Sequence, residues 1–220
     1  MQRILEPEVM DTWAEAVEYD AMDFTAVNTA FAQLVLQLLP QQGTILDLGT
    51  GTARIPILVA QQSPQLNIIG IDLSENMLKI GRENVNSAGL NHQIKLEKVD
   101  AKNLSYLDQQ FDGVISNSII HHLPDPIPCL KEIKRILKPN GGLLLRDLLR
   151  PENTETWEHL VREYAADCND HQRQLFRDSL QAAFTLEEVE QMIKMAGLEE
   201  IKVYQSSDRH WTAQRDFKVR

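Results

Sequence analysis

The fold is decided by residues 45–53, ILDLGTGTA, where an apolar run ends in an acid and a glycine-rich turn. Glycine lets the backbone take positive φ angles and come close to a ligand. The helix expected after the turn offers unpaired backbone N–H groups at its start. The carboxylate of Asp47, just before the glycines, would repel a pyrophosphate but suits a cationic ammonium group. These residues therefore predict a ligand-binding loop between a buried strand and a helix.

A second apolar run, residues 68–72 (IIGID), also ends in an acid, Asp72, which lies 23 residues after Gly49. Dinucleotide-binding proteins place a ribose-binding carboxylate about 20 residues after their glycine turn. The third glycine of their fingerprint would stand at position 54, where this chain has Arg54. The spacing predicts that Asp72 holds ribose hydroxyls, in a site that differs from the dinucleotide type.

Further along the chain, short apolar runs alternate with helix-length amphipathic stretches, which is typical of βαβ units around a parallel sheet. The expected strands are residues 44–48, 67–71, 93–99, 113–116 and 142–146, and the expected helices lie at about 52–62, 75–88 and 126–137. The sequence PNGG at 139–142 predicts a tight turn into the fifth strand.

Near the C-terminus, Thr185 and Glu188 have the spacing of a capping box, which predicts a helix from there to about residue 196. Two β-like runs follow at 200–205 and 210–217, and residues 206–208 suit a hairpin turn between them. Antiparallel strands added to a parallel sheet make the sheet mixed.

Composition excludes several classes of protein. The chain has 220 residues, of which 43% are hydrophobic and 25% charged, an ordinary balance for a folded domain. Its net charge of −10 and the lack of any Lys/Arg run of four argue against nucleic-acid binding. Two cysteines, Cys129 and Cys168, form no C-x-x-C pair and no disulfide framework. We expect no bound metal, no membrane span and a cytoplasmic location.

The motifs taken together resemble those of class I S-adenosylmethionine-dependent methyltransferases over about residues 43–149. The matching stretches, in chain order, are DLGTGTA (47–53), IIGIDLSENML (68–78), LEKVDAKNL (96–104), FDGVISNSIIHHLPD (111–125) and LKEIKRILKPNGGLLL (130–145). The sequence departs from the family pattern at Ala53, where many members have a third glycine.

The resemblance implies an α/β fold, a doubly wound, Rossmann-like three-layer α/β/α sandwich. Its seven-stranded mixed sheet would have the order 3-2-1-4-5-7-6. We predict a single domain over residues 1–220. Its parts are an N-terminal helical lid (1–42, with Asp23 or Thr25 as a helix cap), a cofactor-binding core (43–149), a substrate-covering helical segment (150–184), and a last helix with a terminal hairpin (185–220).

The resemblance also implies a cofactor, S-adenosylmethionine, and a product, S-adenosylhomocysteine. Asp47 would bind the methionine ammonium group, Asp72 the ribose hydroxyls and Asp100 the adenine amino group. Leu73 and Met77 would pack on the adenine, although both also suit the ordinary packing of a helix on a sheet. The full predicted cofactor set is Tyr19, Asp47, Gly49, Thr50, Gly51, Asp72, Leu73, Met77, Asp100, Ala101, Asn117 and Ser118.

The acceptor side is expected beyond the carboxyl ends of the fourth and fifth strands, where ligands bind in open α/β sheets. Candidate catalytic residues are His121, His122 and Asp147, since histidine titrates near neutral pH and either ring suits a general base. Two arginines after the fifth strand suit an anionic group on a compact acceptor. The candidate substrate-binding residues are Arg146, Arg150, Tyr164, His171 and Arg177. Each of these also has a purely structural interpretation, as a helix cap, an ion pair or a solvated helix face.

We therefore predict methyl transfer from S-adenosylmethionine to a small-molecule acceptor by in-line displacement. Three alternatives remain open: a protein- or RNA-modifying methyltransferase, a non-catalytic cofactor-binding module and an NAD(P)-dependent oxidoreductase. The oxidoreductase is disfavoured by Arg54, and by the lack of a Tyr-x-x-x-Lys motif. A base-modifying enzyme is disfavoured because the chain reads Asn-Ser-Ile-Ile at 117–120 rather than Asn-Pro-Pro-Tyr. The acceptor and the oligomeric state are not predicted.

Overall fold

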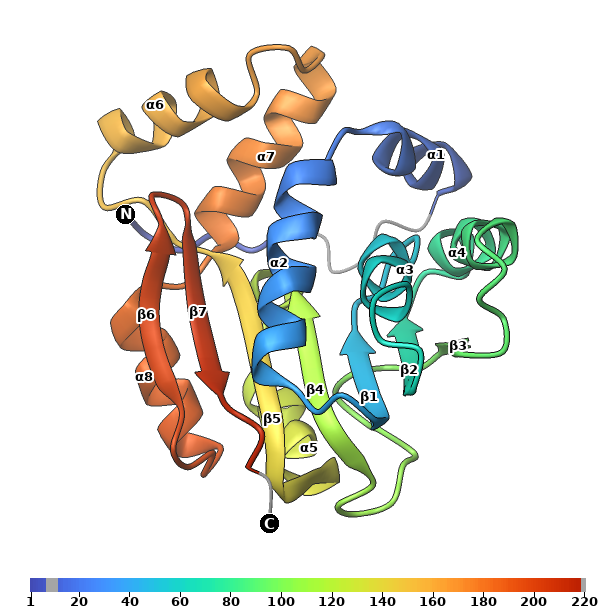
Figure 1. Ribbon diagram of the computed structural model, residues 1–220. Helices are drawn as coiled ribbons and strands as arrows, with labels where there is room; N and C mark the ends of the chain where they lie inside the picture. The colour runs from blue at the N-terminus through green and yellow to red at the C-terminus, as the bar shows by residue number, and fades with distance from the viewer. Residues whose placement is uncertain (7–11, 219–220) are drawn as a thin grey trace.

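A seven-stranded sheet forms the centre of the computed structural model, which describes residues 1–6 and 12–218 (Figure 1). Its order is β3-β2-β1-β4-β5-β7-β6, with β1 to β5 parallel and β7 antiparallel to both of its neighbours. The predicted mixed sheet and its strand order are therefore confirmed. The strands are β1 (Gly43–Leu48), β2 (Leu66–Asp72), β3 (Ile94–Lys98), β4 (Phe111–Asn117), β5 (Leu137–Leu148), β6 (Lys202–Ser207) and β7 (His210–Arg215).

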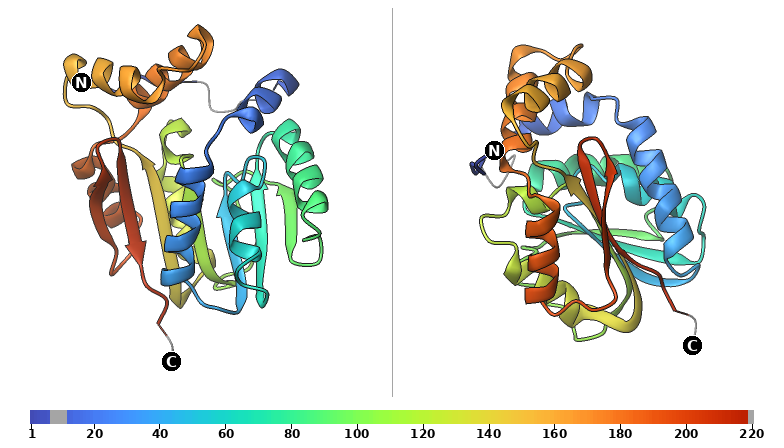
Figure 2. Two further views of the ribbon diagram at one scale, coloured as in Figure 1. Left: turned by 45° about the horizontal axis from the view of Figure 1, so that its top comes forward. Right: turned by 90° about the vertical axis from the view of Figure 1, so that its left-hand side faces the viewer.

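Helices cover both faces of the sheet, which gives the three layers expected (Figure 2). Residues of α2, α3 and α4 share one buried apolar cluster, and residues of α5 and α8 share the other. Successive residues of the central strands alternate between the two clusters, as the period of two in a strand requires. The helices are α1 (Trp13–Ala21), α2 (Thr25–Leu38), α3 (Arg54–Ala60), α4 (Glu75–Ser87), a 3-10 helix η1 (Ile120–His122), α5 (Ile127–Ile136), α6 (Thr154–Tyr164), α7 (Asp170–Ala182) and α8 (Leu186–Met195).

Helices α1, α6 and α7 stand beyond the carboxyl ends of the parallel strands, at the top of Figure 1. Two of them, α6 and α7, pack on each other and on the end of β5 through a small apolar cluster that includes Leu148, Leu160 and Leu180. The third, α1, lies across from them above β1 and β2.

The N-terminal segment differs from the predicted helical lid. Residues 1–6 contain no helix, residues 7–11 lie outside the described residues, and two helices follow at 13–21 and 25–38. The second, α2, buries Phe31, Ala32 and Val35 against the sheet and is part of the core layer. Its N-cap is Phe24 rather than Asp23 or Thr25, although Asp23 accepts a hydrogen bond from the backbone N–H of Thr25. Of the two helices in this segment, α1 is the one that reaches over the ends of the strands.

The prediction of a turn before the fifth strand at residues 139–142 is wrong, since β5 begins at Leu137 and continues through these residues to Leu148. Leu137 pairs with Phe111 and Gly142 with Gly113, so the extra residues form an irregularity inside the strand. The predicted capping box at Thr185 and Glu188 is present.

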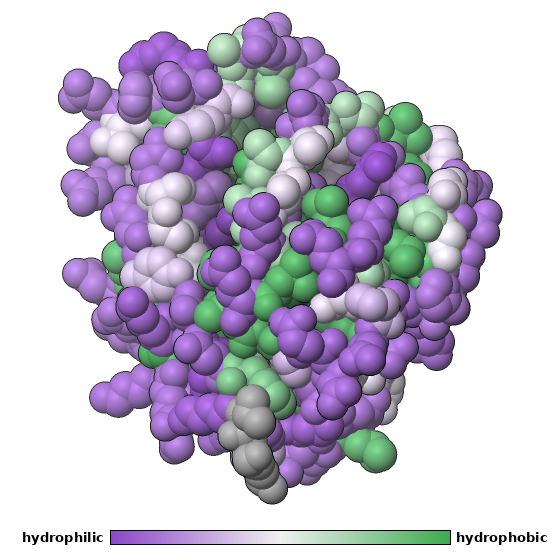
Figure 3. All heavy atoms as spheres, viewed as in Figure 1, coloured by the Kyte–Doolittle hydropathy of each residue, from purple (hydrophilic) through white to green (hydrophobic). Residues whose placement is uncertain are grey.

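The outer surface agrees with the acidic, charged composition. Figure 3 shows the face seen in Figure 1 to be mainly hydrophilic, with the visible hydrophobic residues gathered over α2 and α3. Among the residues that the structure describes, no helix is both long enough and apolar enough to cross a membrane.

A test of the role of α2 uses Gly142, where an added Cβ would lie 2.3 Å from Cδ2 of Leu39, just beyond the end of that helix. Gly142→Ala should lower the free energy of unfolding by about 1–3 kcal/mol, because overpacking forces atoms apart. Leu39→Ala alone should cost about 2–5 kcal/mol. In the double variant, Leu39→Ala removes the atoms with which the new Cβ would clash. Its loss of free energy of unfolding, measured with urea, should therefore be smaller than the sum of the two single losses by at least about 0.5 kcal/mol. Additive losses would show that this end of α2 does not rest on β5.

Candidate active site

The turn between β1 and α3 has three residues in the left-handed region. The φ angles of Gly49, Gly51 and Ala53 are 70°, 55° and 63°. Glycine takes these angles without strain, whereas an alanine such as Ala53 takes them at a cost of about 1–2 kcal/mol. The glycine expected at the third position by family resemblance would therefore fit the backbone that this chain adopts.

The same turn is fastened to the end of the neighbouring strand, β2. The backbone N–H groups of Gly49 and Thr50 both donate to the carbonyl of Ile71 over 2.9 Å. The N–H of Gly51 donates to Oδ2 of Asp72 over 2.9 Å. A Cβ at position 49 would lie 1.7 Å from Cγ2 of Ile119, so the chain that follows β4 also requires glycine there.

A cavity opens beside this turn, at the carboxyl ends of β1, β2, β3 and β4. It contains most of the residues predicted to bind the cofactor, together with Ser74, Ile119 and His122. The predicted residues that line it are Tyr19, Gly49, Gly51, Asp72, Leu73, Met77, Asp100, Ala101, Asn117 and Ser118. The other two predicted residues, Asp47 and Thr50, line an adjoining cavity that shares Tyr19, Gly49 and Asn117 with the first. The structure thus brings all twelve together around the glycine turn, and we call the two hollows the cofactor cavity.

Asp47 is a buried acid at the floor of this cavity, with 2% of its surface exposed. Burial raises its pKa to about 7, the charge of Asp72 adds to the rise, and the nearby hydroxyl of Thr50 partly opposes it. A buried carboxylate of this kind favours a cationic partner, because an opposite charge offsets the loss of hydration.

Asp72 lies at the other side of the turn, and its two oxygens already accept backbone N–H groups from Gly51 and Ser74 over 2.9 Å each. Burial nevertheless raises its pKa, against the effect of these hydrogen bonds. A carboxylate has about four lone-pair sites, so acceptor capacity remains for ligand hydroxyls.

The remaining predicted contacts surround an apolar slot beside Asp72. Met77 is buried in a small cluster with Ala16 and Ile80, so its packing role and its place in the cavity wall coexist. Asp100 is 40% exposed at the rim, and its Oδ1 accepts from the backbone N–H of Lys102 over 2.8 Å. The slot offers an apolar wall and a nearby hydrogen-bond acceptor, which are the two features that an adenine ring requires.

Helix α1 is held over the cofactor cavity by polar contacts at both of its sides. Asp20 accepts two hydrogen bonds from Arg54, over 2.9 and 2.7 Å, and one from Asn84 over 3.1 Å. On the opposite side, Glu18 accepts from the side chain of Asn169, next to α7, over 2.9 Å. These contacts place Tyr19 so that its side chain lines the cofactor cavity and also the cavity described next.

A second cavity lies between α1, the start of α2, η1, α7 and the hairpin of β6 and β7, and we call it the acceptor cavity. It shares Tyr19, Asn117, Ser118 and His122 with the cofactor cavity, so the two are contiguous. Much of its wall is apolar, formed by Met22, Phe24, Val27, Leu148, Ala165, Cys168, Leu175 and Phe176.

Of the five residues predicted to bind substrate, only Tyr164 lines the acceptor cavity. Arg146 lies just outside its wall, where it donates to Oδ1 of Asn117 over 3.0 Å and to the carbonyl of Val27 over 3.2 Å. Burial, reinforced by the charge of Arg209, lowers the pKa of Arg146 to about 10. This arginine ties β5 to α2 and fixes Asn117 at the junction of the two cavities.

The other three predicted residues are engaged elsewhere. Arg150 is buried and pairs with Glu188 over 2.7 Å, which joins β5 to α8. Arg177 pairs with Glu158 over 2.8 Å and joins α7 to α6. His171 is 59% exposed at the start of α7. Their positions favour the structural interpretation of each.

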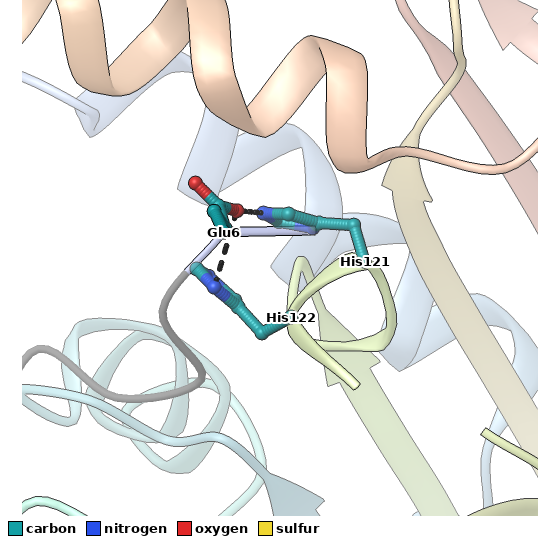
Figure 4. Close-up of side chains that lie close together, drawn as sticks. All are labelled: Glu6, His121 and His122. Atoms are coloured by element: carbon teal, nitrogen blue, oxygen red, sulfur yellow. Dashed lines mark ion pairs between the residues drawn. The ribbon is translucent and has the colours of Figure 1, made fainter. Parts of the chain in front are cut away.

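The three candidate catalytic residues gather in one cluster with Glu6. Figure 4 shows the two histidines and Glu6 of this cluster. Nδ1 of His121 contacts Oδ1 of Asp147, and its backbone N–H donates to Oδ2 of the same carboxylate over 3.0 Å. Burial lowers the pKa of His121, but Asp147 and Glu6 outweigh that effect and raise it to about 9. Burial likewise opposes the ionised form of Asp147, yet His121 and two backbone N–H groups hold its pKa below its ordinary value.

Several lining residues were not predicted from the sequence. The apolar wall of the acceptor cavity comes from α2, α7, β5 and the chain beside them. Glu6, which lines neither cavity but contacts the histidine pair, precedes that pair by more than a hundred residues. Nothing in the local pattern of these segments distinguishes a residue that lines a cavity from one that packs in the core. The acidic strand ends and the histidine pair were the features whose local sequence indicated a place in the site.

Comparison with known proteins agrees with this geometry. Residues 40–211 match the model of a family described as a methyltransferase domain. A demethylmenaquinone methyltransferase of Listeria welshimeri is 38% identical over 126 residues, which are 56% of this chain and 52% of that protein. One of Bacteroides fragilis is 35% identical over 113 residues, 51% of this chain and 45% of that protein. The chain thus spans about half the length of the curated relatives it matches.

Solved structures share the fold. A candidate S-adenosylmethionine-dependent methyltransferase of Methanococcus maripaludis has a TM-score of 0.75 at 21% identity, over 100% of this chain and 99% of that one.

The raised pKa of Asp47 predicts that the buried acid that favours a cationic ligand also lowers the stability of the folded chain. Because its pKa is about 7 when folded and near 3.8 when unfolded, folding costs free energy once the unfolded chain ionises. The cost grows from about pH 4 to pH 7 and is complete above pH 7. Asp47→Asn should therefore raise the free energy of unfolding more at pH 8 than at pH 5, by about 1–3 kcal/mol, in thermal or urea unfolding. An equal change at both pH values would contradict a raised pKa.

Proposed function

Because this chain belongs to the methyltransferase-domain family, we propose that it transfers the methyl group of S-adenosylmethionine to a small, largely apolar acceptor. The observation that carries this proposal is a pair of acids on either side of one glycine turn, the buried Asp47 and the half-buried Asp72. A cationic amino-acid end and a ribose are the two groups that such a pair recognises, and S-adenosylmethionine contains both.

In this proposal each part of the cofactor meets a feature already described. Asp47 pairs with the ammonium group of the methionine part, and the backbone of residues 49–51 lies along that part. Asp72 accepts from the ribose hydroxyls. Leu73 and Met77 pack on the adenine, while Asp100 accepts from its amino group. Tyr19 and Asn117 then stand where the cofactor cavity meets the acceptor cavity.

When bound, the cofactor supplies a methyl group on a cationic sulfur, and transfer of that group leaves S-adenosylhomocysteine. The residues of the chain contribute chiefly by position, since holding two reactants in line replaces an encounter in solution. Arg146 fixes Asn117, and the positive φ of Ser118, 69°, places that residue at the same junction. The helices α1 and α7 cover the junction and limit the access of water.

The nature of the acceptor follows from the wall of its cavity. Much of that wall is apolar, and two of the arginines predicted to attract an anion are paired with glutamates outside it. Arg209 does line the cavity, where its guanidinium stacks on the ring of Tyr164. These observations favour an acceptor with an apolar body over the compact anion expected from the sequence. The relatives named demethylmenaquinone methyltransferases also have, by that name, an apolar acceptor, which supports the same class.

The cofactor class is tested by thermal unfolding with S-adenosylmethionine, S-adenosylhomocysteine, NAD and NADP at equal millimolar concentrations. A ligand that binds only the folded state at 100 times its dissociation constant stabilises by about 2.7 kcal/mol. For a domain of this size, that corresponds to a rise in Tm of about 5–10 °C. We expect the rise with the two adenosyl compounds alone. A rise with a nicotinamide nucleotide alone would replace the proposal with an oxidoreductase.

The ribose contact is tested by Asp72→Ala. Losing a charge-assisted acceptor should weaken S-adenosylmethionine binding by about 1.5–3 kcal/mol, which is roughly ten- to a hundredfold in calorimetry. Asp108→Ala, at an exposed carboxylate away from both cavities, is the matched control and should bind as the wild type does. Wild-type affinity in folded Asp72→Ala would remove Asp72 from the site.

A further inference from the structure

The first six residues form an extended arm that is fixed to the body of the molecule. The guanidinium of Arg3 donates to the carbonyls of Ala182, His121 and Leu123, over 2.7, 3.0 and 2.9 Å. The guanidinium also lies 3.8 Å from the centroid of the Phe184 ring. The backbone N–H of Ile4 donates to the backbone carbonyl of Gln181. These contacts carry Glu6 to a buried position beside the histidine pair.

Three potential metal-ligand atoms converge at the end of this arm (Figure 4). Oε1 of Glu6 lies 3.2 Å from Nε2 of His121 and 3.2 Å from Nδ1 of His122, and all three atoms lie within 4.8 Å of one another. A tetrahedral ion about 2.0–2.1 Å from each ligand holds its ligand atoms about 3.3–3.4 Å apart. The carboxylate oxygen therefore lies at nearly the separation from each imidazole nitrogen that a shared ion requires.

The cluster also has the outer contacts that orient ligands in metal sites. His121 presents its other ring nitrogen to Asp147, in the carboxylate–histidine arrangement that commonly supports a metal-bound imidazole. The second oxygen of Glu6 accepts from the hydroxyl of Ser179 over 3.0 Å. The side chains of Glu6, His121 and Asp147 are 7%, 4% and 0% exposed, and that of His122, on the side of the acceptor cavity, is 23% exposed. A surface ion pair would have neither this burial nor this second layer of hydrogen bonds.

We propose that Glu6, His121 and His122 bind one divalent transition-metal ion, with Zn²⁺ as the best match to two imidazoles and one carboxylate. This replaces the expectation of no metal drawn from the sequence. Both histidines line the acceptor cavity, so the fourth position of the ion faces that cavity and is open to water or to an oxygen atom of a ligand. The ion also joins the N-terminal arm to η1.

Metal binding is tested directly on the full chain, purified without a histidine tag and freed of metal with a chelator. Calorimetric titration with Zn²⁺ should show one equivalent bound with a dissociation constant below about 1 μM. Titration with Co²⁺ should give the visible absorption bands of a four- or five-coordinate ion. Glu6→Gln and His122→Gln should each weaken Zn²⁺ binding more than tenfold.

Matched controls use residues of the same types at exposed positions, namely Glu155→Gln and His92→Gln, which should bind Zn²⁺ as the wild type does. Metal-free Glu6→Gln must show cooperative unfolding, so that lost binding is not lost folding. Ser179→Ala, which removes only an outer hydrogen bond, should weaken Zn²⁺ binding less than Glu6→Gln does.

The proposal is overturned if the wild type shows no one-equivalent site, or if it binds Zn²⁺ no more tightly than Glu6→Gln does. The cluster would then be an ionic network that holds the arm without a metal. Because the titration needs neither cofactor nor acceptor, its outcome is independent of whether the chain binds S-adenosylmethionine.

Discussion

The structure depends on the attachment of the glycine turn after β1 to the end of β2. Parallel pairing sets Leu48 beside Ile71, so the turn that follows emerges next to the last residues of β2. Its N–H groups then bond to the carbonyl of Ile71 and to the carboxylate of Asp72. The same acid therefore shapes the loop and lines the cavity that the loop creates. A side chain at position 49 would collide with Ile119, so the loop has little freedom to move elsewhere.

The rest of the site is formed by helices that cover the ends of the strands and the attached turn. The sheet ends supply the acids and the glycine backbone, and α1 closes over them through Asp20 and its partners on α3 and α4. Helices α6 and α7 close the other side around an apolar cavity. Tyr19, Asn117, Ser118 and His122 line both cavities, which makes their junction the place where a donor and an acceptor meet.

Local patterns were sufficient for most strands and for the acidic strand ends, because each depends on residues close together in sequence. The strand order joins distant segments, and its prediction came from the resemblance to the methyltransferase family. The apolar residues of α2 gave a correct helix, but the sequence could not show that Phe31 and Val35 bury against the sheet rather than form part of a lid. The PNGG sequence was misleading, since residues 139–142 lie inside β5, at an irregularity between its pairings of Leu137 and Gly142 with β4. Arg150 and Arg177 could not be separated from ligand-binding arginines, because their glutamate partners are fixed only by the packing of α6 to α8. Glu6 could not be predicted either, because its contact with His121 and His122 depends on the packing of distant segments.

The most direct test of the account is a crystal structure with S-adenosylhomocysteine bound. The account predicts ribose hydroxyls within hydrogen-bond distance of Asp72, the amino group beside Asp47, and the adenine between Leu73 and Met77. The sulfur should then face the acceptor cavity at Asn117 and Ser118. A ligand bound elsewhere, or bound with its ribose away from Asp72, would contradict the claim that the glycine turn and its two acids form the cofactor site.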